Sequence, residues 1–265
     1  MATVVPRPRS CLPRLSQPRR HPHGARPRLD SAVTHGQRGR VTTNSPASLS
    51  GWREAAAGLV DVLVGVRCLQ CDRPGTTWCR ACVESAWAPQ VWHWPDGRSI
   101  VAATSYRSFV RQALVAHKER GQLSLARPLG TLLARAVSGL TSPDELLVVP
   151  CPSSAKATRD RGQDHAFRVA SAASRGLASI GVSASATRLL RIQRPMVDQV
   201  GLSPNDRLTN ARGAFVARLG VANAPEVIVV DDVTTSGATL VEADRALREA
   251  GWRVRGCAVV ARAGS

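Results

Sequence analysis

Two adjacent carboxylates, Asp231 and Asp232, follow the aliphatic run 227–230 and precede the hydroxyl-rich turn 234–239. Adjacent like charges cost free energy unless a cation or hydrogen-bond donors meet them. The hydroxyls and successive backbone N–H groups of such a turn can surround an anion, and Gly237 lets the backbone come close to it. A helix that follows the turn adds the positive end of its dipole. The residues therefore predict a phosphate site with two carboxylates beside it.

The two carboxylates suit sugar hydroxyls, or a magnesium ion that bridges them to a polyphosphate. The alternative is an acidic strand end followed by an ordinary helix that a Thr or Ser side chain caps. Two adjacent acids, with four hydroxyl residues around one glycine, make that alternative weaker.

A second group with chemical potential is the pattern C-x2-C-x7-C-x2-C, formed by Cys68, Cys71, Cys79 and Cys82. Each C-x2-C pair can place two thiolates on one turn, and two such turns can close a tetrahedral structural zinc site. Two disulfides, unliganded thiols and an iron site are the alternatives, and a cytosolic setting disfavours the disulfides. A closed four-thiolate site leaves no position for substrate, so we expect it to act in folding and partner recognition. Cys151 and Cys257 are expected to be small packed residues.

Alternating strand and helix patterns must position these groups. Strands are expected at 100–106, where a hairpin ends, and at 145–152, 186–192, 226–232 and 252–262. Helices are expected at 48–65, 109–121, 125–140, 164–181 and 237–251, the second of them closing on Gly121. Aliphatic strands that alternate with helices indicate an α/β fold with a parallel sheet covered on both faces.

Composition limits the class of protein. The net charge is +17, and residues 1–50 hold nine arginines against one aspartate. A basic surface favours anionic partners such as phosphates or nucleic acid, although an Arg-heavy composition can also reflect genome base composition. No stretch approaches the roughly 18 to 20 apolar residues of a membrane span, and the N-terminus lacks a secretory signal, so we expect a cytoplasmic protein.

Three segments are expected along the chain. Residues 1–48 are predicted to be a disordered Arg- and Pro-rich tail, 49–95 a helix with the cysteine knuckle, and 96–265 the α/β domain.

The thirteen residues VIVVDDVTTSGAT at 227–239 resemble the phosphoribosyl pyrophosphate (PRPP) signature of the type I phosphoribosyltransferases. In that family the two acids hold the ribose hydroxyls and the turn holds the 5-phosphate. The resemblance implies a type I phosphoribosyltransferase-like sheet flanked by helices, magnesium bound with PRPP, and Asp231 and Asp232 as catalytic residues. The phosphate-binding residues that it implies in the turn are Thr234, Thr235, Ser236, Gly237, Ala238 and Thr239.

A four-cysteine knuckle ahead of such a domain resembles the ComF family of competence-associated proteins. Further matching pieces are Tyr106, Arg111, Lys118, VVPCP at 148–152, RDRGQDHA at 159–166 and LLRIQRP…NARGAF at 189–215. The stretch RGQDHA departs from the family, whose members usually carry R-G-[FY]-N-Q-A there.

The ComF resemblance implies further site residues. Ser153 would lie in the pyrophosphate-side loop, and Arg159 and the catalytic Arg161 would reach pyrophosphate through the bidentate fork of the guanidinium. A mobile hood at 191–212 would supply Arg191, Arg194, Gln199, Arg207 and Asn210. His117 and His165 are candidate proton donors, although a lone histidine is more often structural.

Two functions follow. The first is an enzyme that binds magnesium and PRPP, transfers phosphoribose to a nitrogen nucleophile with release of pyrophosphate, and is associated with DNA uptake. The second is a non-catalytic protein that binds single-stranded DNA or DNA-uptake proteins. Trp87, Trp92 and Trp94 are its candidate base-stacking residues, but packing in the hairpin is the favoured role for them, and an aromatic content of 4% is low for a strand-binding groove.

Overall fold

The computed structural model of the 265-residue chain describes residues 65–94, 97–140, 145–153, 164–196 and 203–264. These residues belong to one compact unit, Ser48–Ser265. The predicted tail 1–48 and almost all of the predicted helix at 48–65 lie outside the described residues. Arg159, Arg161 and Gln199 also lie outside them.

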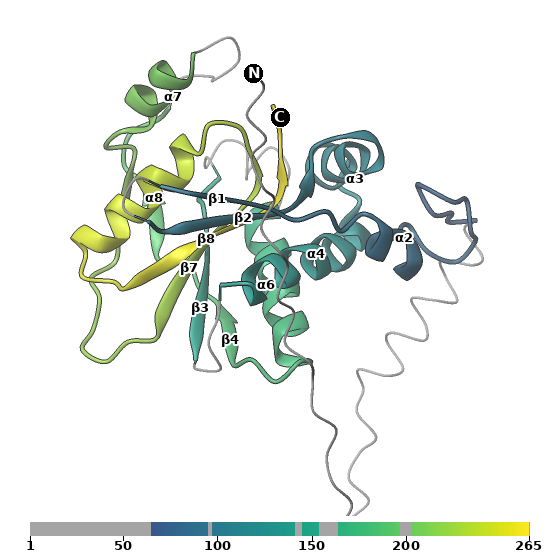
Figure 1. Ribbon diagram of the computed structural model, residues 1–265, viewed down its shortest axis with the longest axis horizontal. Helices are drawn as coiled ribbons and strands as arrows, with labels where there is room; N and C mark the ends of the chain where they lie inside the picture. Colours follow the sequence, from purple (N-terminus) through teal and green to yellow (C-terminus); the bar gives the residue numbers. More distant parts are fainter. Residues whose placement is uncertain (1–64, 95–96, 141–144, 154–163, 197–202, 265) are drawn as a thin grey trace, which may run out of the picture. The chain divides into compact units, whose positions relative to one another are not determined.

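The centre of the fold is a six-stranded sheet in the order β1-β2-β8-β7-β3-β4. Its strands are β1 (Gln90–His93), β2 (Ser99–Ser105), β3 (Leu146–Pro150), β4 (Ala184–Ala186), β7 (Glu226–Thr234) and β8 (Val254–Arg262). Only β1 among them runs antiparallel to its neighbour, β2, with which it forms the expected hairpin. The predicted parallel sheet is therefore confirmed (Figure 1).

Helices cover both faces of this sheet, as the all-aliphatic strands require. The described helices are α2 (Arg80–Ser85), α3 (Ser108–Glu119), the short 3₁₀ helix η1 (Leu123–Leu125), α4 (Ala126–Ser138), α6 (His165–Ala178), α7 (Pro204–Ala211) and α8 (Ala238–Glu249). Helices α3, α4 and α6 pack on one face, where Ile228 and Val230 of β7 point. Helix α8 packs on the other face, against Val227 and Val229 (Figure 1).

A second, two-stranded antiparallel sheet joins the α8 side. It consists of β5 (Leu190–Ile192) and β6 (Phe215–Ala217), and its buried residues Leu190 and Phe215 share a core with α8. The backbone N–H of Phe215 donates to the buried carboxylate of Glu242 in α8, 3.0 Å away. This contact fixes the small sheet on the helix.

The sequence predicted one strand at 186–192, and the structure divides it. Residues 184–186 form β4 at the edge of the main sheet, and residues 190–192 form β5 in the second sheet. Arg188, between them, stacks on Phe167 at 3.4 Å and pairs with Asp164 at 3.1 Å, so the chain is held on α6 where it leaves the main sheet. A strictly local pattern cannot reveal such a change of partner.

Two further elements differ from the sequence prediction. Helix α7 lies within the predicted hood at 191–212, where the sequence predicted no helix. Its start signal is Ser203, whose hydroxyl accepts from the Asp206 N–H at 3.2 Å. Strand β7 continues past the two acids to Thr234, because β8 runs beside it as far as Arg262.

The connections create a topological switch point between β3 and β7. From β3 the chain crosses to β4 on one side, and from β7 it crosses to β8 on the other side. Open parallel sheets bind ligands outside the carboxyl ends of the strands at such a point. The acid pair of β7 and the loop after β3 both lie at this edge.

Candidate functional site

The two acids occupy the carboxyl end of β7 at the switch point. Pro150, the last residue of β3, pairs with Val230, so the acids extend beyond the end of β3. On the other side, Asp231 still pairs with Val259 of β8. The acids therefore have one fixed and one open flank, and the open flank lies beside Cys151, whose N–H donates to the Val230 carbonyl at 2.9 Å.

Strand alternation sends the two neighbouring carboxylates to opposite faces of the sheet. Asp231 follows Val229 toward the α8 side, where it interacts with Cys151. Asp232 follows Val230 toward the α3 side, where its Oδ2 lies 3.4 Å from the Lys118 Nζ. The cation that the adjacent charges require thus comes from the last turn of α3.

The two acids point to different faces of the sheet and also have different electrostatic surroundings. Burial and the charge of Asp232 raise the pKa of Asp231 to about 8, although the Asp232 N–H, 2.8 Å from Asp231 Oδ1, and Lys118 act in the opposite sense. Burial and the neighbouring Asp231 raise the pKa of the Cys151 thiol well above its usual value. Both shifts favour the protonated forms of the Asp231 carboxyl and the Cys151 thiol.

The turn after β7 has the conformation of an open helix start. Gly237 adopts a left-handed conformation with φ 80° and occupies the N-cap of α8 without a side-chain cap hydrogen bond. The Ala238 N–H makes one long hydrogen bond, to the Ser236 Oγ at 3.4 Å. An ordinary capped helix would have a well-formed cap here, so the geometry favours donors that are available to an anion.

The side chains of the turn are not equally available. Thr234 and Ala238 are buried, and Ala238 can therefore offer only its backbone N–H. Ser236 and Thr239 are partly buried, and Thr235 is exposed. Three hydroxyls of the predicted phosphate site are thus accessible to some degree.

The four cysteines come together as their spacing predicted. Their sulfur atoms all lie within 4.8 Å of one another, and Cys71 Sγ is 3.6 Å from Cys79 Sγ. Cys68 and Cys71 lie on a loop closed by the bridge between Arg67 and Pro74, whereas Cys79 is the N-cap of α2 and Cys82 lies in its first turn. All four are free thiols, so the disulfide alternative is not what the structure contains.

The donor set of this cluster fits a metal ion. The Cys79 N–H donates to Cys68 Sγ at 3.4 Å. Burial opposes ionisation of Cys68, but backbone N–H groups of Cys79, Cys71 and Gln70 outweigh it and lower the pKa of that thiol to about 6. A preformed thiolate with three further sulfurs in reach is the ligand set of a structural metal site.

The remaining predicted site residues have different positions. Ser153 is partly buried. It is the third residue after Pro150, the last residue of β3, and so lies at the carboxyl edge of the sheet. Arg191 lies exposed on β5, and no contact with the acid pair is recorded among the described residues. Arg194 donates to the carbonyls of Asn210 at 2.6 Å and Arg212 at 2.8 Å, so it ties β5 to the end of α7.

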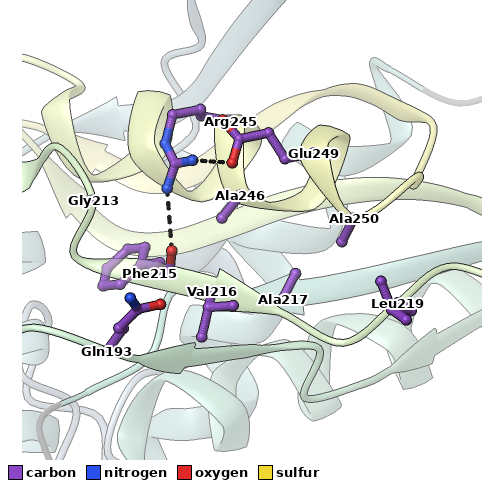
Figure 2. Close-up of a pocket in the computed structure, with 10 residues that line it drawn as sticks. All are labelled: Gln193, Gly213, Phe215, Val216, Ala217, Leu219, Arg245, Ala246, Glu249 and Ala250. Carbon is purple, nitrogen blue, oxygen red and sulfur yellow. Dashed lines mark hydrogen bonds and ion pairs between the residues drawn. The ribbon is translucent and has the colours of Figure 1, made fainter.

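A cavity of about 400 Å³ lies between β6 and the C-terminal half of α8. Figure 2 shows the residues that line it. It lies at the opposite end of α8 from the turn, and neither acid lines it. The guanidinium of Arg245 is engaged there by Glu242, Glu249 and the Phe215 carbonyl. This cavity is therefore separate from the acid site.

Sequence reasoning missed two contacts at the acid site. Cys151 interacts with Asp231, and His117 lies against His165, with 3.4 Å between their Nδ1 atoms. The two histidines are far apart in the chain, and only the packing of α3 and α6 on the same face brings them together. The prediction that Cys151 and Cys257 are packed core residues is confirmed, since both are buried.

Neither a scan against protein-family models nor a search of curated proteins finds a match for this chain. Within the described residues, no helix has the length and apolar character needed to cross a membrane.

Asp231→Asn should stabilise the free protein at pH 8 and have little effect at pH 4. A carboxyl whose folded pKa is raised to about 8 favours folding fully below its unfolded pKa, and this contribution is lost as the pH rises toward 8. The Asn side chain cannot ionise, so the variant does not lose this contribution. Its free energy of unfolding at pH 8 should exceed that of the wild type by on the order of 1–3 kcal/mol. Urea unfolding of both proteins across this pH range measures it. Equal stabilisation at both pH values would contradict the assignment.

Metal removal should destabilise the fold around α2. We expect one equivalent of metal in the purified protein, and a Cys68→Ser variant that loses it and unfolds at a temperature several degrees lower, because metal binding is coupled to folding. Elemental analysis and thermal unfolding test this, with Cys257→Ser, a buried thiol outside the cluster, as the control for loss of a core sulfur. A Cys68→Ser protein that retains its metal would refute the four-thiolate site.

Proposed function

We propose that this protein binds PRPP, or a related phosphorylated ribose, together with magnesium, and transfers phosphoribose to a nitrogen nucleophile with release of pyrophosphate. One observation carries the proposal: Asp231 and Asp232 lie in the last part of β7, beyond the end of β3 at the switch point, and β7 leads through a short turn into the start of α8, whose N-cap makes no side-chain hydrogen bond. A type I phosphoribosyltransferase requires this combination, because the ribose and its 5-phosphate are bound by adjacent parts of one segment.

The turn 234–239 is suited to the 5-phosphate. Backbone N–H groups at the start of α8 and the accessible hydroxyls of Thr235, Ser236 and Thr239 can donate to phosphate oxygens. Gly237 provides the left-handed conformation at the bend, and the space where its Cβ would lie is empty to 4 Å. A ligand can therefore approach the backbone there without a side chain in its path.

The acids are suited to the ribose. Lys118 keeps Asp232 paired with a cation, so this carboxylate can accept a hydrogen bond from a hydroxyl. The raised pKa of Asp231 favours its protonated form, which can donate a hydrogen bond, and the ionised form can accept one. Negative charge beside the ribose ring would stabilise the positive charge that develops as the bond to pyrophosphate breaks.

Pyrophosphate would leave toward the loop that follows β3. Ser153 lies in this loop, three residues after Pro150, the last residue of β3. Bound magnesium would neutralise part of the pyrophosphate charge. Catalysis of this type depends on positioning and charge stabilisation, so it needs no activated side-chain nucleophile.

We further propose that the four cysteines hold structural zinc and that the chain is a ComF-like protein associated with DNA uptake. A tetrahedral four-thiolate set is the preferred arrangement for zinc, and three of the four sulfurs are buried. The cysteine cluster packs into the same core as α4 and α6. Zinc would therefore stabilise the region that supports α3 and its Lys118.

The alternative, binding of single-stranded DNA through aromatic stacking, is less well supported. Each candidate tryptophan already has an arginine over its ring: Arg135 on Trp87 at 4.8 Å, Arg262 on Trp92 at 4.4 Å and Arg98 on Trp94 at 4.6 Å. A base would have to displace these guanidinium groups before it could stack.

Calorimetric titration of PRPP with magnesium into the full-length, metal-loaded protein tests the proposal. We expect saturable binding that weakens by about 10-fold or more in the double variant Asp231→Asn, Asp232→Asn, because two hydrogen bonds to charged or polarised groups are lost. Glu226→Gln is the matched control, since Glu226 is an exposed acid at the opposite end of β7.

The result is decisive in either direction. A folded wild-type protein that does not bind PRPP, or a double variant that binds it as well as wild type, would refute the PRPP site. If the wild-type protein binds PRPP and the double variant does not, release of pyrophosphate with candidate nitrogen acceptors would separate an enzyme from a protein that only binds the ligand.

A further inference from the structure

A buried pair of histidines lies behind the acid site. His117 belongs to the last turn of α3, and His165 is the first residue of α6. Their exposed fractions are 2% and 5%, their Nδ1 atoms are 3.4 Å apart, and their rings meet edge to face with centroids 5.2 Å apart. This geometry joins two helices through a single contact between ring nitrogens.

The contact between two Nδ1 atoms requires one proton between them. In a hydrogen bond between them, one ring must carry a proton on Nδ1 and donate, while the other has a bare Nδ1 and accepts. Two rings with the same protonation at Nδ1 would place two protons or two lone pairs against each other. The pair therefore has a defined protonation pattern that nuclear magnetic resonance can observe.

The surroundings keep His117 neutral. Burial lowers the pKa of His117 to about 4, His165 and Arg168 of α6 act in the same direction, and Asp232 of β7 opposes them. Lys118, on α3 itself, is a further charged group near the site. At physiological pH His117 is thus the uncharged ring in the contact with His165.

The pair is directly connected to the acid site along the chain. Lys118 follows His117, and its Nζ lies 3.4 Å from Asp232 Oδ2. His117 is held in the core, whereas the Lys118 side chain is 45% exposed and has a flexible stem that packing alone does not fix. Fixing the last turn of α3 on α6 therefore restricts where the ammonium group can lie.

We propose that His165, through its hydrogen bond to His117, positions Lys118 against Asp232 and so controls how tightly the acid site holds its ligand. The statement about the ligand rests on the proposed function, whereas the positioning of Lys118 does not. His165 is a positioning residue, because it is buried and acts through its contact with His117.

A double-mutant cycle in the ligand-free, full-length protein tests the positioning. His165→Leu and Lys118→Met are made singly and together, and urea unfolding gives the equilibrium constant of each. Independent effects would multiply. We expect the double variant to be at least about three-fold more stable than that product, because Lys118 loses most of its pairing once its helix turn is released. Multiplying effects would overturn the proposal.

Two variants separate the hydrogen bond from general packing. His165→Asn places an amide near the position of Nδ1 and should restore most of the coupling to Lys118. Ser174→Ala removes a buried hydroxyl of α6 that bonds within the helix, to the Ala170 carbonyl at 3.1 Å, and should show no coupling. Coupling with Ser174→Ala as large as with His165→Leu would mean a general loss of helix packing and would overturn the proposal.

Nitrogen-15 spectra of the wild-type imidazoles test the pair even where a variant does not fold. At pH 7 one of the two histidines should carry a proton on Nδ1 and the other should not. A proton on Nδ1 in both rings, or in neither, would overturn the hydrogen bond and, with it, the proposal.

PRPP titration with magnesium adds the ligand arm. His165→Leu should weaken binding by roughly 5-fold in the wild-type background and have little effect in the Lys118→Met background, since a single lost hydrogen bond has about this net effect. If wild type does not bind PRPP, the proposed function fails, and the ligand-free cycle still decides the role of His165. Equal weakening in both backgrounds would contradict action through Lys118.

Discussion

Placing two negative charges next to each other at the end of a buried strand is the constraint on which the site depends. Repulsion between Asp231 and Asp232 is reduced in two ways. The pleat of β7 directs them to opposite faces, and each meets a different partner: a protonated Cys151 on one side and Lys118 on the other. Burial and the charge of Asp232 still disfavour the ionised form of Asp231 and raise its pKa. A ligand that offers hydroxyls or positive charge would relieve it, so the free site is electrostatically prepared for binding.

The topology supplies each of these partners. The order of β8, β7 and β3 places the acids beside the loop after β3, and the crossover from β7 to β8 starts α8 immediately beyond them. Helix α3 reaches the site because it packs on the same face as α4 and α6. The four-cysteine cluster, which is compatible with a structural metal, is part of that same core and so is linked to the support of Lys118.

Much of this arrangement could be predicted from the sequence, because it depends on local patterns. Strands buried on both faces are aliphatic throughout, Gly121 with φ 65° ends α3, and the spacing of the cysteines allows them to converge. The partner change between β4 and β5 depends on Arg188 and its distant contacts, and no local pattern reveals it. The histidine pair likewise depends on packing between α3 and α6. The roles of Arg159 and Arg161 stay predictions, since both lie outside the described residues.

A crystal structure of the full-length protein soaked with PRPP and magnesium would test the central claim most directly. The account predicts the 5-phosphate against the backbone of the turn 234–239 and the ribose hydroxyls against Asp231 and Asp232. Electron density for the ligand elsewhere, such as the cavity between β6 and α8, with the turn unchanged, would contradict it.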